Sequence, residues 1–206
     1  MTGKFISIEG VEGAGKSTQV SFIHDYLNDL GKTVIVTREP GGTALSEKIR
    51  SLLLTPSSPA MAVDTELLLM FAARAEHIAK VISPALQRGD WVLCDRFVDA
   101  TFAYQGGGRG VSQRRIQTLA DWTLHGLKPD LTLLFDLPVA LGLERVIQRQ
   151  EAIDRFEQEK VDFFEKIREN YLHRAIAEPD RIKVVDASLS IADIQGQLIQ
   201  LLKPLI

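Results

Sequence analysis

The sequence predicts an α/β fold in which a parallel sheet is covered by helices on both faces. Short apolar runs recur along the chain, and longer segments with helical periodicity separate them. The runs do not alternate apolar with polar residues, which is typical of strands buried on both faces of a parallel sheet. Strands that alternate with helices favour the same arrangement. Because ligands of such sheets bind beyond the carboxyl ends of the strands, motifs that follow a strand are the first candidates for function.

Five strands are expected, each a short run of mostly apolar residues. They lie at Phe5–Ile8, Thr33–Val36, Trp91–Cys94, Leu131–Phe135 and Ile182–Val185. Periodicity predicts helices at Ser17–Leu30, Thr43–Leu54, Ser112–His125 and Ser190–Leu202, and a long helix from Asp64 towards Gly89. Gly31 closes the first helix, Asp64 is expected to cap the long helix, and Pro84 is expected to bend it.

Bulk composition indicates one globular domain over residues 1–206, with 45% hydrophobic and 25% charged residues. The net charge of −3 argues against nucleic acid as a partner, since binders of a duplex usually carry a basic excess. No apolar run reaches the ~18 residues of a membrane span, and the N-terminus lacks the layout of a signal peptide. The single cysteine, Cys94, is expected to be buried and fits a reducing compartment. The cytoplasm is the expected location.

The segment Gly10-Val11-Glu12-Gly13-Ala14-Gly15-Lys16-Ser17 is a complete phosphate-binding P-loop motif between a predicted strand and a predicted helix. Its glycines let backbone N–H groups turn towards an anion at the helix N-terminus. Lys16 is expected to reach the β- and γ-phosphates of ATP, and the Ser17 hydroxyl to ligate Mg²⁺. The alternative is a surface lysine beside a glycine-rich turn, and the motif in its context argues against it.

Charged residues follow two further predicted strands. Asp95 and Arg96 stand at the end of the third strand, where an aspartate can hold the magnesium shell and an arginine can clamp a phosphate. Arg38 follows the second strand and falls at the same rim. Asp136, after the fourth strand, is an alternative metal ligand, although either aspartate could instead cap a helix. Two arginines and a lysine exceed what one triphosphate needs and suit two phosphorylated ligands.

Residues able to read a base lie in two segments. Phe71 and Arg74 are three positions apart and so share a helix face. Phe71 could stack on a base, and Arg74, which carries only donors, would favour a carbonyl over an amine. Gln105, in the glycine-rich segment Thr101–Arg109, can both donate and accept. The alternatives are a core phenylalanine beside a salt-bridged arginine, and a flexible loop that ends a helix.

Together these motifs resemble the thymidylate kinase family over nearly the whole chain. The resemblance is carried by Glu9–Thr18, Thr37–Thr43, Asp95–Phe97 and Ala103–Gly110. It implies transfer of the terminal phosphate of ATP to dTMP with Mg²⁺ as the metal. It also implies a homodimer and a P-loop kinase fold with a five-stranded parallel sheet and a small helical lid.

The resemblance assigns residues to each ligand. Those implied for ATP are Gly10, Val11, Glu12, Gly13, Ala14, Gly15, Lys16, Ser17, Thr18 and Arg145, and those implied for dTMP are Glu12, Arg38, Phe71, Arg74, Arg96, Thr101, Tyr104 and Gln105. The residues implied for catalysis are Lys16, Arg96, Arg149, Glu12 and Asp95, and those for the metal are Ser17 and Asp95.

Several of these assignments are specific. By resemblance, Phe71 stacks on thymine, Arg74 bonds the carbonyl at C4, and Tyr104 leaves no room for a 2′-hydroxyl. Thr101 and Gln105 lie at the base edge.

The acceptor phosphate is assigned in the same way. Arg38 and Arg96 hold it, Glu12 lies near it and the 3′-hydroxyl, and Asp95 orients the magnesium shell. No general base is expected, because a phosphate oxygen is already anionic and positioning should carry most of the rate.

The segment from Gly142 to Arg155 resembles the lid of the bacterial branch of the family, which supplies basic residues, so the lid is expected to supply the charge that stabilises the transition state. One branch of the family carries an arginine in the P-loop where this chain has Gly13. The lid, at about 141–156, offers Arg145 and Arg149 on one helix face. Arg149 is the first candidate for contact with the transferring phosphate, ahead of Arg155 and Arg145. An exposed helix with intrahelical ion pairs is the alternative for each.

Other functions fit the P-loop alone. A switch or motor ATPase would hydrolyse ATP without an acceptor, and the arginine-rich rim argues against it. An idle nucleotide-binding module should have lost Lys16, Asp95 or the lid arginines, and this chain keeps them. A kinase of the same fold for another nucleoside monophosphate is a further alternative, and an assay across several acceptors would distinguish it.

Overall fold

The computed structural model describes residues 3–56, 59–148 and 154–206, and it confirms the predicted α/β class. Five parallel strands form one sheet in the order β2-β3-β1-β4-β5. The strands are β1 (Phe5–Glu9), β2 (Val34–Arg38), β3 (Trp91–Asp95), β4 (Leu131–Asp136) and β5 (Ile182–Asp186). Each ends on a charged residue, so the carboxyl edge of the sheet collects the polar side chains that the motifs supply.

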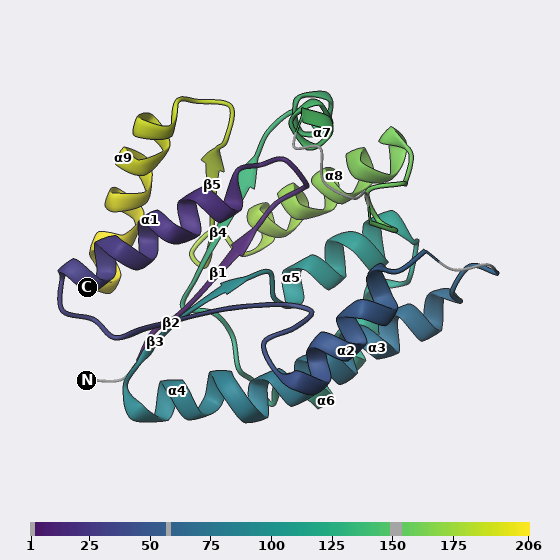
Figure 1. The fold of residues 1–206 in the computed structure, drawn as a ribbon, viewed down its shortest axis with the longest axis horizontal. Helices are drawn as coiled ribbons and strands as arrows, with labels where there is room; N and C mark the ends of the chain where they lie inside the picture. The colour runs from purple at the N-terminus through teal and green to yellow at the C-terminus, as the bar shows by residue number, and fades with distance from the viewer. Residues whose placement is uncertain (1–2, 57–58, 149–153) are drawn as a thin grey trace.

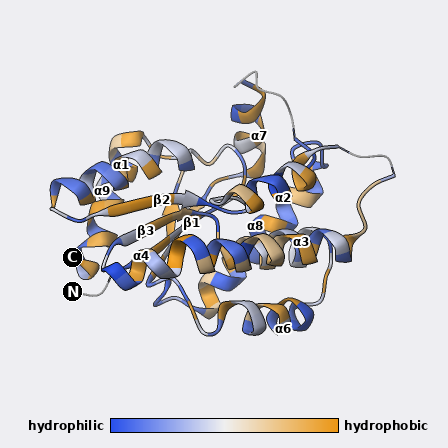
Figure 2. Cartoon of the chain, turned by 60° about the horizontal axis from the view of Figure 1, so that its bottom comes forward, coloured by the Kyte–Doolittle hydropathy of each residue, from blue (hydrophilic) through white to orange (hydrophobic). Residues whose placement is uncertain are grey.

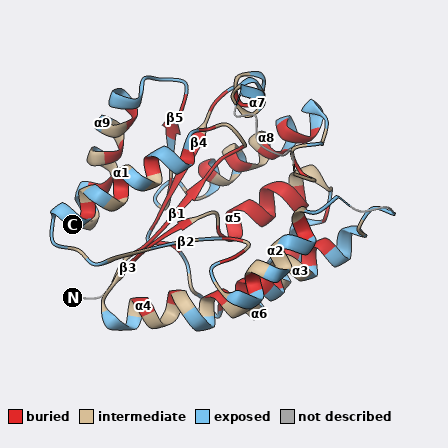
Figure 3. Ribbon diagram, in the orientation of Figure 1, coloured by how far each residue is buried: buried red, intermediate tan, exposed pale blue. Residues whose placement is uncertain are grey.

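Helices cover both faces of the sheet, as Figure 1 shows. On one face, Ile6, Ile8 and Leu93 pack in the same core as α1 (Lys16–Asp29) and α9 (Ile191–Leu202). On the other, Phe5 and Val92 pack with α4 (Ser83–Arg88). The central strands β1, β3 and β4 are almost wholly buried, whereas the edge strands β2 and β5 are partly exposed (Figure 3). Surface helices carry apolar and polar residues on different faces in Figure 2. This burial accounts for the unbroken apolar runs in the sequence.

The long helix expected from Asp64 differs in detail. It comprises α3 (Val63–His77), a π-helical turn η1 (Ile78–Ile82) and α4. The wide turn ends directly before Ser83 and Pro84, where proline removes a helical donor. Asp64 is not the cap, because Ala62 occupies that position and the Asp64 carboxylate pairs with Arg115 at 2.9 Å.

Two shorter helices keep their predicted positions with capped starts. Thr43 precedes α2 (Ala44–Leu54) and Ser112 precedes α6 (Gln113–Leu124), and each side-chain oxygen accepts a backbone N–H three residues on. The short 3₁₀ turn η3 (Lys203–Leu205) follows α9.

Four further elements among the described residues lie outside the helices that periodicity predicted, although α7 (Val139–Gln148) overlaps the helical lid expected at about 141–156. These are α5 (Val98–Thr101), the π-helical turn η2 (Phe102–Gly108), α7 and the long α8 (Val161–Ala177). The glycines of η2 allow close packing, because a Cβ on Gly107 would come within 2.7 Å of the Lys166 carbonyl oxygen. The segment Thr101–Arg109 is thus a packed helical turn rather than a flexible loop. Within the described ranges, no helix is long and apolar enough to cross a membrane.

Candidate active site

The P-loop lies where β1 meets α1 at the carboxyl edge of the sheet. Gly10, Gly13 and Gly15 have φ angles of 136°, 72° and 75°. Residues other than glycine rarely adopt positive φ angles. The loop therefore keeps its shape only with glycine at these positions. The loop leads directly into the N-terminus of α1, which is where the motif predicts an anion site.

Lys16 folds back over this loop. Its Nζ donates to the carbonyl oxygens of Gly10 at 3.0 Å and Val11 at 2.8 Å. Burial, followed by the nearby Arg96 charge, lowers the pKa of Lys16 to about 8. Both of these partners are loop carbonyls, so a bound phosphate would replace a partial opposite charge with a full one.

Asp95 and Ser17 fit a magnesium ion better than the alternative, Asp136. The Asp95 Oδ1 atom is buried and without a hydrogen-bond partner in the described structure, and Asp95 and Ser17 line the same groove. Asp136 is occupied by a bidentate ion pair with Arg168, at 2.7 and 2.9 Å. No cluster of three or more His, Cys, Asp or Glu ligands occurs in the described part of the chain. A site with two protein oxygens suits Mg²⁺, which takes its other ligands from water and phosphates.

A separate cleft lies beside the P-loop and includes Glu12 in its lining. Glu12, Arg96 and Tyr104 form its phosphate end. Arg96 donates to the Glu12 carboxylate and to the Tyr104 hydroxyl, each at 2.8 Å, and Tyr104 donates to Glu12 at 2.7 Å. Burial raises the pKa of Tyr104 well above its usual value, so its hydroxyl stays a donor. Three residues expected at one ligand are therefore in mutual contact.

Arg74 and Gln105 form the opposite end of the cleft. The Arg74 guanidinium is held by Glu39, which accepts from Nε at 2.7 Å, and by the Phe97 carbonyl, which accepts from Nη2 at 3.1 Å. Its third nitrogen, Nη1, is buried and unpaired among the described residues, as is Gln105 Oε1. Both side chains line the cleft beside Thr101. One unused donor and one unused acceptor thus lie at the wall where a base edge was expected.

Phe71 does not line the cleft, although its assignment to base stacking would place its ring there. It is 4% exposed, belongs to the core between α3 and the sheet, and is absent from the cleft lining. The preceding residue, Met70, lines the cleft instead. Three-residue spacing places Phe71 and Arg74 on one side of the helix, where the Arg74 guanidinium lies 5.0 Å from the Phe71 ring. Phe71 therefore packs in the core against the Arg74 guanidinium, whereas Arg74 itself lines the cleft.

Arg50, and not Arg38, lines the cleft in which Arg38 was expected. Arg38 is half-exposed, pairs with Glu47 at 2.9 Å, and lines the groove of Ser17 and Asp95. Arg50, which the motifs did not indicate, lines the cleft and donates to the Pro40 carbonyl at 2.9 Å. Burial, then the charges of Arg38 and Arg96, lowers the pKa of Arg50. Repulsion of this kind marks a cluster of cations that an anion would relieve.

The helix α7 lies directly on the P-loop. A Cβ on Gly13 would overlap the Gly142 carbonyl, and one on Gly142 would come within 2.6 Å of the Glu12 carbonyl oxygen. Arg145 donates to the Gly13 carbonyl at 3.4 Å and to the Ala187 carbonyl at 3.2 Å, between the loop and the end of β5. This position is compatible with the expected contact to ATP.

The remaining lid arginines have different outcomes. Arg149 lies outside the described residues. Arg155 donates to the Leu53 carbonyl at 2.7 Å and pairs with Glu66 at 2.7 Å, so its guanidinium anchors the C-terminal end of the expected lid to α2 and α3. This anchoring role argues against Arg155 as a partner of the transferring phosphate.

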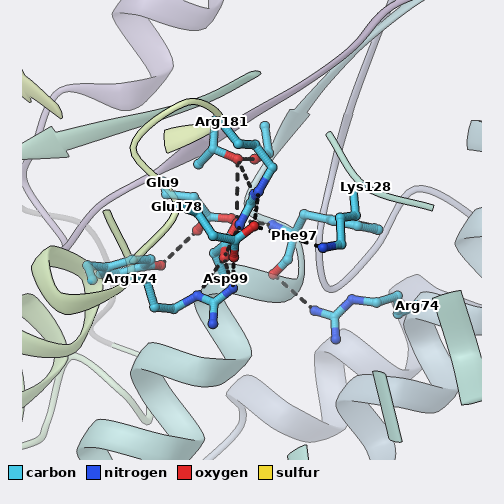
Figure 4. A network of polar contacts seen from close by, with 11 residues as sticks. Glu9, Arg74, Phe97, Asp99, Lys128, Arg174, Glu178 and Arg181 are labelled. Atoms are coloured by element: carbon cyan, nitrogen blue, oxygen red, sulfur yellow. Dashed lines mark hydrogen bonds and ion pairs between the residues drawn. The ribbon is translucent and has the colours of Figure 1, made fainter. Parts of the chain in front are cut away.

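A buried polar network supports the site from below (Figure 4). Glu9, the last residue of β1, accepts from the Phe97 backbone N–H and the Tyr171 hydroxyl, each at 2.8 Å. Burial, and then the neighbouring Asp99, raises the pKa of Glu9 to about 8. The Phe97 turn follows Arg96, whose φ of 67° is unusual for a side-chain-bearing residue. Glu9 therefore fixes the turn from which Arg96 reaches the cleft.

Asp99 is the charged centre of this network. It accepts from Arg174 at 2.6 Å and from Arg181 at 2.7 Å. Burial alone would raise the pKa of Asp99, but the two arginines outweigh it and hold that pKa below its usual value. These contacts join α5, α8 and the start of β5, and so fix the scaffold of the cleft.

Comparisons with known proteins agree on one family. The family model described as thymidylate kinase matches residues 8–198. The chain is 57% identical to a thymidylate kinase of Pseudomonas savastanoi pv. phaseolicola, over all of this chain and 98% of that protein. It is 53% identical to one from Alcanivorax borkumensis, over 98% and 97% of the two chains. A crystal structure of thymidylate kinase from Ehrlichia chaffeensis superposes with a TM-score of 0.79 at 31% identity, over 98% and 99%.

Proposed function

This chain belongs to the thymidylate kinase family and transfers the terminal phosphate of ATP to dTMP, and we propose how its side chains divide that work. ATP binds on the P-loop, and dTMP binds in the cleft lined by Arg74, Arg96 and Gln105. The two phosphates then meet between Lys16 and Arg96.

The unpaired atoms at the base end of the cleft carry the proposal. Thymine presents a carbonyl at C4 and an N–H at N3, so it accepts at the first position and donates at the second. Arg74 Nη1 is an unused donor and Gln105 Oε1 an unused acceptor. Cytosine would present an amine at C4, which donates, and an unprotonated N3, which accepts, so both hydrogen-bonding roles would be reversed. A buried polar atom left without a partner costs about 1–3 kcal/mol, so this pair favours thymine.

The acceptor phosphate binds Arg96 and Arg50, both of which line the cleft. Arg38 supports the donor side, where it shares a groove with Asp95. Glu12 holds the Arg96 guanidinium, and Tyr104 fills the space beside the sugar. Met70, rather than Phe71, offers its side chain to the face of the base.

Ser17 and Asp95 would hold Mg²⁺, which supplies charge neutralisation at the phosphates of ATP. Lys16 adds a positive charge at the same phosphates, and Arg149 adds one from the lid. No group in this chain needs to remove a proton from the acceptor, because its phosphate oxygen is already anionic. Positioning and electrostatic stabilisation therefore account for the rate.

The protein acts as a homodimer through α3 and α6. These helices contact each other, and each leaves a large apolar side chain in solvent, Leu68 at 56% and Trp122 at 75% exposed. Exposed aromatic residues of this size are typical of protein interfaces. A single domain over 1–206 and a cytoplasmic location remain predictions.

Release of ADP in a coupled assay tests the substrate, with dTMP, dUMP, dCMP, dGMP and UMP as acceptors. We expect strong preference for dTMP, and Arg74→Met should raise the KM for dTMP about tenfold. Rapid ATP turnover without an acceptor would reject the division of ligands, and equal use of dCMP would reject the role of Arg74.

A further inference from the structure

Glu66 lies directly behind the base end of the cleft, and no motif singled it out. It stands in the first turn of α3, is 1% exposed, and is absent from the cleft lining. Its carboxylate accepts from Gln105 Nε2 at 2.8 Å. Figure 3 shows that α5 and the turn after it, which carry Gln105, are buried almost throughout. A buried carboxylate next to a side chain that reads the base can control how that side chain is presented.

Two cations fix what Glu66 can offer. Arg155 pairs with it at 2.7 Å and Arg109 at 3.4 Å. A carboxylate paired with two guanidinium groups has acceptor atoms only. It therefore binds the amide nitrogen of Gln105 and repels the amide oxygen. The two ends of a glutamine amide are nearly identical in shape, so this chemistry, and not packing, selects the orientation.

We infer that Glu66 is a positioning residue for base selectivity, because it turns the Gln105 amide so that Oε1 rather than Nε2 faces the base. This inference rests on the proposed binding of the base beside Gln105. With Oε1 in the cleft, the amide accepts from the N3–H of thymine. With the amide reversed, Nε2 would oppose that N–H and would instead suit the unprotonated N3 of cytosine.

Glu66→Gln tests the inference, since a second amide can accept or donate and no longer dictates one orientation. We expect kcat/KM for dTMP to fall about tenfold while kcat/KM for dCMP does not fall. A merely structural role would lower both values together. Arg109→Gln is the matched control, because it removes a cation beside Glu66 but leaves the acceptor for Gln105, and it should keep the ratio of the two values.

Two further variants separate this inference from the proposed function. Gln105→Met should lower the dTMP to dCMP ratio, and adding Glu66→Gln to it should change the ratio no further. An unchanged ratio in Gln105→Met would reject the base contact itself. A reduced ratio in Gln105→Met together with a wild-type ratio in Glu66→Gln would reject only the role of Glu66.

Loss of the buried ion pairs could also unfold Glu66→Gln. Combining it with Arg155→Met removes the cation left unpaired, and replacing both members of a buried pair costs less than removing one. The same selective loss of dTMP turnover is expected in this double variant, and a wild-type ratio there would overturn the inference.

Discussion

The Arg96 guanidinium donates to the Glu12 carboxylate at 2.8 Å, which ties the turn after β3 to the loop that binds ATP. Both residues line the cleft proposed for dTMP, and Glu12 also belongs to the P-loop. The two proposed ligand sites therefore share one charged contact, and the charges of Arg96 and Glu12 both act on Lys16. A change in either ligand's phosphate alters the charge that the other site experiences.

Activity should depend on the charge of Lys16. Burial lowers the pKa of this amine to about 8, so the free enzyme loses a positive charge as the pH rises through that value. The kcat/KM for ATP reports the free enzyme and should fall about tenfold per pH unit above it. Lys16→Arg should show no such fall. A flat wild-type profile up to about pH 10 would contradict the assignment, as would near-normal activity in folded Lys16→Ala.

Stability should depend on pH through Glu9. Because burial raises the pKa of Glu9 from its ordinary 4.5 to about 8, the folded chain holds this proton over a range in which the unfolded chain has lost it. Its stabilising contribution is complete below about pH 4.5 and is lost as the pH rises through about 8. Glu9→Gln should therefore raise Tm at pH 7.5 by several degrees, and this advantage should vanish near pH 4.5. Thermal unfolding by circular dichroism measures both, and a constant difference would contradict the prediction.

Arg50 should matter more to dTMP than Arg38. Arg50 lines the cleft, whereas Arg38 pairs with Glu47 and lines the groove that contains Ser17 and Asp95. A charge-assisted hydrogen bond contributes about 1.5–3 kcal/mol, so Arg50→Met should raise the KM for dTMP by about 10-fold to 100-fold. Arg38→Met is the matched comparison and should change it only a few-fold. The reverse order would restore the acceptor phosphate to Arg38.

Arg149 and Arg145 should separate catalysis from ATP binding. Arg149→Ala should lower kcat about 100-fold with little effect on the KM for dTMP, as expected of a charge used in the transition state. Arg145 lies between the Gly13 and Ala187 carbonyls. Arg145→Ala should instead raise the KM for ATP. Steady-state kinetics with both substrates distinguishes the two, and an Arg149 effect confined to KM would move the catalytic role to another arginine.

The dimer should dissociate when charge is placed on α6. Trp122→Glu buries a carboxylate in the proposed interface and should give a monomer in size-exclusion chromatography with light scattering. Ile176→Glu is the control, because Ile176 on α8 is 77% exposed yet lies outside this surface. A Trp122→Glu dimer of normal stability would place the interface elsewhere.

Sequence reasoning located the residues at the carboxyl edge of the sheet where a motif consists of consecutive residues next to a strand. The P-loop and the Asp95-Arg96 pair each follow a strand within a few positions, so the parallel sheet brings them to one edge. Sequence reasoning missed Arg50 and Glu66 because their roles depend on residues that are distant in sequence and close only in the folded structure. An arginine or a glutamate in a helix is common and does not by itself indicate a site. Phe71 was misplaced because one position along a helix turns a side chain by about 100°, from the cleft into the core.

The contact between Gly13 and Gly142 has a consequence for how such enzymes diverge. Since even a methyl group on Gly13 would overlap α7, a loop arginine and this placement of α7 are mutually exclusive. A lineage could not acquire the loop arginine by one substitution while α7 stayed in place. It would first have to withdraw the helix, and with it the arginines that the helix and its lid carry. The two solutions to the same charge problem are thus separated by a steric barrier, and intermediates that combine them should be rare.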